Sequence, residues 1–84
     1  MADQLPTGWS AGDGKLVRRW ETGDFQTALK LTNQIGAIAE KLNHHPDLQL
    51  GHGYLTASTI THSAGKLTDH DYQLAIAINE ELDD

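Results

Sequence analysis

The feature that most constrains the fold is a long amphipathic stretch, Thr22 to Asn43, that closes just before Pro46. Apolar or small residues recur along it at steps of three and four, at Phe25, Ala28, Leu29, Thr32, Ile35, Gly36, Ala39 and Leu42. This spacing predicts a helix with one apolar face. Asp24 is suited to cap its start. Pro46 supplies the stop, because the residue before a proline is pushed out of the helical region.

Two pairs of short extended runs flank this helix. The first pair occupies residues 9–21 and turns at Asp13-Gly14, a dipeptide typical of tight hairpins. The second pair occupies residues 47–61 and is interrupted by a Gly-His-Gly segment. Its second run is rich in threonine, which favours an extended strand. The sequence therefore predicts four short strands.

A second helix is predicted after the last strand. Thr68 is suited to cap it, and Asp71, three residues on, can complete a capping box. Its apolar stripe is Leu74, Ala75, Ile78 and Leu82. The order strand, strand, helix, strand, strand, helix indicates an α+β fold, with a four-stranded antiparallel sheet and two main helices packed on one face. The other face must then be wetted or covered by a second subunit.

Size and charge narrow the class of protein. The chain of 84 residues is expected to form a single domain spanning residues 1–84, and it contains no cysteine for disulfides. A domain this small often gains stability by association, so we expect an oligomer. The net charge of −6 repels phosphate backbones and argues against nucleic-acid binding. No apolar run approaches the roughly 20 residues of a membrane span, and no secretory signal is recognisable, so a cytoplasmic location is expected.

All five histidines fall in one part of the sequence: His44, His45, His52, His62 and His70. Glu40 lies one helical turn before His44, so its carboxylate is expected to meet and orient that imidazole. The carboxylate and the negative end of the helix both favour the imidazolium form, which suits a general acid near neutral pH. His62 ends the fourth predicted strand, and its ring could approach the corner formed by His44 and His45.

Each of these residues also has a purely structural interpretation. His44 can serve as a helix cap, His45 as a surface residue before a proline, and His62 as a turn residue bonded to the backbone. Asp71 has a good role as the capping-box carboxylate. A metal site is not expected, because adjacent histidine side chains diverge and helical zinc pairs stand four residues apart.

Taken together, these motifs resemble one known family. The segments "EKLNHHPD" and "THSAGKLTDHD" are similar to the signature of the pterin-4a-carbinolamine dehydratases, also called 4a-hydroxytetrahydrobiopterin dehydratases. The residues that fall on the family spacing without an insertion are Glu40, His44, His45, Pro46, His62 and Asp71. The dipeptide "GW" at 8–9 and "RRW" at 18–20 are also similar, so the resemblance covers roughly residues 5–82.

The resemblance implies both a fold and a reaction. It implies a four-stranded antiparallel sheet with helices on one side, and a homodimer or homotetramer. The implied enzyme is a dehydratase (a hydro-lyase) that removes water from a 4a-hydroxytetrahydropterin and gives a quinonoid dihydropterin, in tetrahydropterin recycling. The hydroxide leaving C4a needs a proton donor and the N5–H needs an acceptor. Imidazoles can supply both without a metal or a cofactor.

The resemblance also implies roles for individual residues. His44 and His62 would transfer protons, while His45 would mainly bind the pterin ring and assist. Four further residues would support the site: Glu40 by orienting His44, Asp71 by hydrogen bonding, and Thr59 and Thr61 through backbone groups offered to the pterin edge.

A non-enzymatic function is the alternative. Relatives of this family serve as protein-binding cofactors in transcription or as assembly chaperones for the carbon-fixing carboxylase of carboxysomes. Such relatives tend to lose part of the histidine set, whereas this chain keeps it, so the enzyme is favoured. A dual role, with a hydroxylase or another protein as partner, is the third hypothesis.

Overall fold

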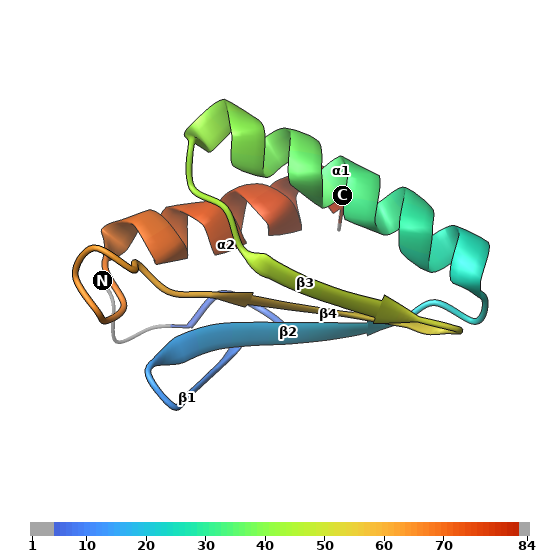
Figure 1. The fold of residues 1–84 in the computed structure, drawn as a ribbon, viewed down its shortest axis with the longest axis horizontal. Coiled ribbons are helices and arrows are strands. Elements are labelled where there is room, and N and C mark those ends of the chain that lie inside the picture. Colours follow the sequence, from blue (N-terminus) through green and yellow to red (C-terminus); the bar gives the residue numbers. More distant parts are fainter. Residues whose placement is uncertain (1–4, 83–84) are drawn as a thin grey trace.

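The computed structural model describes residues 5–82 and contains an antiparallel sheet covered by two helices (Figure 1). Its elements, in chain order, are β1 (Ser10–Gly12), β2 (Lys15–Glu21), α1 (Phe25–Leu42), β3 (Asp47–Gly51), β4 (Tyr54–Thr59) and α2 (Asp69–Leu82). The strand order is β1-β2-β4-β3, and every neighbouring pair is antiparallel. Both helices lie on the same face of the sheet (Figure 1). The predicted α+β fold is confirmed.

The first hairpin turns where the sequence predicted. Asp13 and Gly14 both have positive φ, at 54° and 76°, as the two central residues of a type I′ turn require. The turn sets the register of β1 against β2, with Ser10 opposite Val17. Glycine suits the second position because it reaches positive φ at no steric cost.

Helix α1 begins later than the predicted start at Thr22. Asp24 is extended, with φ at −150°, and its Oδ1 accepts a hydrogen bond of 2.7 Å from the Thr27 N–H, so the predicted N-cap is confirmed. Thr22 instead donates its N–H to the Gly53 carbonyl at 2.8 Å. The residues before Asp24 are therefore held by the turn between β3 and β4, and they cannot join the helix.

Helix α1 also ends one residue earlier than predicted. Asn43 adopts the left-handed conformation, with φ at 54°. Its N–H donates to the Glu40 carbonyl at 3.3 Å, and the His44 N–H donates to the Ala39 carbonyl at 3.1 Å. This pair of bonds is a Schellman motif, which satisfies the last carbonyls of a helix. His44 therefore lies beyond the helix, in the short connection to β3.

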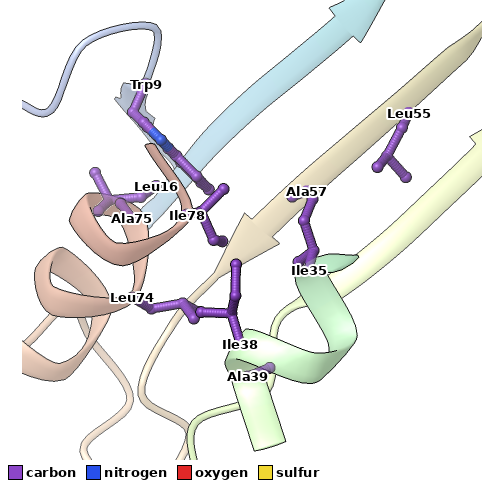
Figure 2. Packing of buried hydrophobic residues seen from close by; sticks show 10 residues of the cluster. All are labelled: Trp9, Leu16, Ile35, Ile38, Ala39, Leu55, Ala57, Leu74, Ala75 and Ile78. Carbon is purple, nitrogen blue, oxygen red and sulfur yellow. The ribbon is translucent and has the colours of Figure 1, made fainter. Parts of the chain in front are cut away.

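The hydrophobic core fills the space between the sheet and the helices (Figure 2). Its buried members are Trp9, Leu16, Ile35, Ile38, Ala39, Leu55, Ala57, Leu74, Ala75 and Ile78. Helix α1 packs over β3 and β4, and α2 packs near β2. Along β4 every second residue is buried, so Thr59 follows Leu55 and Ala57 onto the inner face. The Thr59 hydroxyl therefore lies at the edge of the core, at the end of β4.

The outer face of the sheet carries polar side chains. The Arg19 guanidinium lies 4.5 Å from the Tyr54 ring centroid, and its Nε donates to Glu21 Oε2 at 2.6 Å. No helix of residues 5–82 covers this face (Figure 1). A polar sheet face of this kind can remain in contact with water. Neither helix in that range is long and apolar enough to cross a bilayer.

A side-chain clasp joins the segment before β1 to α2. Asn79 Oδ1 accepts from Trp9 Nε1 at 3.0 Å and from Arg18 Nη1 at 2.6 Å, and Asn79 Nδ2 donates to the Thr7 carbonyl at 2.9 Å. Gly8, at a φ of 85°, lies directly against the Arg18 side chain. The clasp holds the start of the described chain onto the core.

Candidate functional site

At the centre of the site lies a buried carboxylate that accepts four hydrogen bonds. Asp71, at 0% exposure, occupies the first turn of α2. Its Oδ1 accepts from Thr59 Oγ1 and from His44 Nε2, both at 2.6 Å. Its Oδ2 accepts from Thr61 Oγ1 at 2.7 Å and from the Thr68 N–H at 3.0 Å. Four donors satisfy the capacity of a carboxylate, as burial of a charge requires.

Local structure explains why these donors converge. Thr68 caps the start of α2, because its Oγ1 accepts a hydrogen bond from the His70 N–H at 3.3 Å. The Asp71 carboxylate in turn accepts from the Thr68 N–H, which confirms the predicted capping box. Thr59 and Thr61 are two residues apart in extended chain, so both side chains point to the same face. That face looks onto the first turn of α2.

The Asp71 carboxyl is held in its ionised form. Burial alone would raise its pKa, but hydrogen bonds from Thr59, His44, the Thr68 backbone and Thr61 outweigh burial and lower the pKa below its ordinary value of 3.8. The positive end of α2 acts in the same direction. At neutral pH Asp71 is therefore an anion that only accepts hydrogen bonds.

The negative charge of Asp71 determines which ring nitrogen of His44 is hydrogen-bonded and which is left without a partner. Because the carboxylate can only accept, His44 must present a protonated Nε2 to it. Its Nδ1 then has no hydrogen-bond partner among residues 5–82, and 16% of the side chain is exposed. The His44–Asp71 pair is suited to move a proton at Nδ1.

The expectation that Glu40 orients His44 is wrong. The Glu40 carboxylate instead bonds the neighbouring ring, with Oε2 2.6 Å from His45 Nε2. The left-handed residue Asn43 ends the helix before His44, so the one-turn spacing of helical neighbours does not extend to it. His44 is oriented by Asp71, from the other helix. The two side chains of the Glu40–His45 pair are 78% and 55% exposed.

His45 faces an open groove between α1 and β3. The groove has a volume of about 470 Å³ and is lined by Thr32, Asn33, Gly36, Ala37, Ala39, Glu40, His45, Pro46 and Leu48. Gly36 has no side chain, and a Cβ added there would meet nothing within 4 Å. The wall that α1 gives to the groove is therefore low at this residue, and the groove is open. The two histidines of the His-His-Pro corner thus have different carboxylate partners and different surroundings.

His62 lies in an exposed turn directly after Thr61. The Thr61 N–H donates to the Lys66 carbonyl at 3.2 Å, and the Thr61 carbonyl accepts from the N–H groups of Ala64 and Gly65. The backbone groups of Thr61 are thus hydrogen-bonded within the turn, contrary to the expectation that they are offered to a substrate. The Thr61 hydroxyl donates to Asp71. In the described part of the chain, the His62 ring makes no hydrogen bond or ring contact with His44 or His45.

Sequence reasoning missed His70. Its ring centroid lies 5.7 Å from that of His44, with the ring planes inclined at 31°. The available signal was its position directly before the capping-box residue Asp71. No group of three or more histidine or acidic residues between positions 5 and 82 is placed to hold a metal ion.

The fold and this site define a small α+β protein with a buried carboxylate–imidazole pair beside a His-His-Pro corner. A family model described as "Pterin 4 alpha carbinolamine dehydratase" matches residues 1–81. The chain belongs to this family, as its motifs indicated.

Relatives and solved structures agree with this assignment. A Prochlorococcus marinus (strain MIT 9313) protein that carries a provisional pterin-4-alpha-carbinolamine dehydratase name is 35% identical, over 94% of this chain and 81% of the relative. A similarly named Chloroflexus aurantiacus (strain ATCC 29366 / DSM 635 / J-10-fl) protein is 33% identical, over 95% of this chain and 88% of the relative. A transcriptional coactivator/pterin dehydratase from Brucella melitensis superposes with a TM-score of 0.79 at 30% identity, covering 88% of this chain and 81% of that one.

A second solved structure shares the fold alone. It is a pterin dehydratase-like protein identified as a RuBisCO assembly factor in the α-carboxysome, with a TM-score of 0.65 at 15% identity. The alignment covers 86% of this chain and 83% of that one. The same fold is therefore found in a protein with an assembly role.

Proposed function

We propose that this single-domain protein is a hydro-lyase that dehydrates a 4a-hydroxytetrahydropterin to a quinonoid dihydropterin, as a step in tetrahydropterin recycling. The observation that carries the proposal is the His44–Asp71 pair, in which a fully buried, ionised carboxylate holds an imidazole with one ring nitrogen free. Membership of the dehydratase family supplies the substrate class.

In the proposed reaction the C4a–O bond breaks and a C4a=N5 bond forms. His44, whose Nε2 is hydrogen-bonded to Asp71, gives a proton from Nδ1 to the departing hydroxide, which leaves as water. His62 accepts the proton that N5 loses, and exchange with solvent restores both rings. His45, held by Glu40 at the groove, contacts the pterin ring. General acid–base catalysis is worth about 10² to 10⁴-fold in rate, and the proposed reaction uses no cofactor.

The test is a coupled spectral assay with a hydroxylase that generates the carbinolamine. We expect the purified protein to accelerate dehydration, and His44→Ala to lose about 10²-fold of that acceleration because its proton donor is gone. His62→Ala should also lose activity, and the matched control His52→Ala, in the exposed turn between β3 and β4, should keep it. A His44→Ala protein as active as the wild type would refute the proposal.

A protein-binding role is the second candidate. It is supported by the two solved structures described above, one of a transcriptional coactivator/pterin dehydratase and one of an assembly factor. In this case the protein would not accelerate dehydration, and it would bind a defined partner, such as a hydroxylase or a carboxylase, with an affinity that His44→Ala leaves unchanged. Both sets of measurements use the same purified variants.

We also propose that the protein works in the cytoplasm as a homodimer or homotetramer. The support for association is the small size of the domain, since small domains often gain stability by oligomerisation. Sedimentation at several protein concentrations distinguishes these states from a monomer.

A further inference from the structure

One feature of the site has no role in the proposed reaction, namely the packing of His70 against His44. The ring centroids lie 5.7 Å apart and the planes are inclined at 31°. His70 is exposed, whereas only 16% of the His44 side chain is exposed. His70 is therefore the outer ring of the pair, and it covers part of the inner one.

The first turn of α2 fixes both neighbours of His44. The His70 N–H donates to Thr68 Oγ1, so its backbone belongs to the same cap as Asp71. The two side chains leave the helix about 100° apart, one inward and one along the surface. The His44 ring thus contacts two consecutive residues of α2: its Nε2 donates to Asp71, and its outer side lies against the His70 ring.

A single hydrogen bond does not fix the plane of an imidazole. The His44 ring can swing about its Nε2 contact with Asp71, and such motion would turn Nδ1 away from a substrate. Contact with a second ring opposes this motion, because aromatic rings whose centroids lie 4.5–7 Å apart pack against one another favourably. The observed separation lies within that range.

We propose that His70 is a positioning residue, whose ring keeps His44 Nε2 on Asp71 and His44 Nδ1 directed at the substrate. The inference rests on the proposed function for its kinetic consequence, but its geometric part can be measured without any substrate. His70 itself needs no proton-transfer role, so an aromatic ring without nitrogen should replace it.

The test compares His70→Ala and His70→Phe with the control His52→Ala. NMR of the imidazole nitrogens reports the tautomer of His44, and the proton in its bond to Asp71 reports exchange with water. In His70→Ala we expect mixed tautomers, faster exchange of that proton and a kcat lower by about 3- to 10-fold with KM unchanged. His70→Phe should restore the tautomer, the slow exchange and kcat, and His52→Ala should match the wild type.

Two results would overturn the inference. One is a His70→Ala protein with the wild-type NMR signals and kcat. The other is a His70→Phe protein as impaired as His70→Ala, since ring packing would then not be the cause. If the wild type shows no dehydratase activity, the proposed function fails, and the NMR comparison alone still decides whether His70 positions the His44 ring.

Discussion

Asp71 brings together full burial and a lowered pKa, and this links the site to the stability of the fold. Burial would raise the pKa, but the surrounding hydrogen bonds lower it below 3.8. A carboxyl with a lower pKa in the folded state stabilises the fold above its unfolded pKa. That contribution is lost as the pH falls through the folded pKa. The protein should therefore lose stability in acid, below about pH 3.8.

The first prediction compares Asp71→Asn with the wild type by urea unfolding at neutral and acidic pH. The amide puts an N–H₂ where one oxygen accepts two donors, so Asp71→Asn should be markedly less stable at neutral pH. The difference should shrink as the pH falls below 3.8, because the unfolded carboxyl takes up a proton there while the folded one, with its lower pKa, does so only at lower pH. The exposed amide control Gln26→Ala should keep the wild-type pH profile. An unchanging difference would contradict the linkage.

Within the site, contacts between residues close in sequence were easier to predict than contacts between distant ones. The capping box of Thr68 and Asp71 spans three residues and follows from local helix geometry. The bond between His44 and Asp71 joins residues 27 positions apart, and it depends on how two helices pack. The wrong pairing of Glu40 came from extending helical spacing past Asn43, where a left-handed residue had already ended the helix.

At the scale of elements, helix α1 depends on its first cap. Asp24→Ala removes the acceptor for the Thr27 N–H, and we expect it to lower the free energy of unfolding, seen as a lower urea midpoint. Gln26→Ala, in the same turn and exposed, is the matched control. Urea denaturation measures both. Equal effects of the two substitutions would show that the cap is not the source of the stabilisation.

Helix and turn positions were predicted well because their signals are periodic or local. The Asp13-Gly14 turn and the apolar stripe of α1 each lie within one element. The end at Asn43 was missed by one residue, because asparagine tolerates both helical and left-handed conformations and its neighbours decide between them. The central pairing of β2 with β4 joins two hairpins that are separated by α1, so no local pattern reveals its register.

At the scale of the whole molecule, the clasp around Asn79 ties the beginning of the described chain to its last helix. Gly8→Ala places a left-handed alanine whose Cβ would lie 2.8 Å from Arg18 Nε. We expect a loss of about 1–2 kcal/mol in the free energy of unfolding, seen as a lower Tm. Gly12→Ala is the control, since its Cβ would meet nothing within 4 Å. A Gly8→Ala protein as stable as Gly12→Ala would show that the left-handed backbone at residue 8 and its close contact with Arg18 place no demand on stability.

The different carboxylate partners of His44 and His45 have a consequence for descent within such a family. One ring is bonded to a carboxylate of α2 and the other to a carboxylate of α1, so a single change at position 71 removes the partner of His44 and leaves the groove beside α1 untouched. The two halves of the His-His-Pro corner can therefore change independently, and a related chain without the His44–Asp71 pair can still present the groove beside α1 to a binding partner.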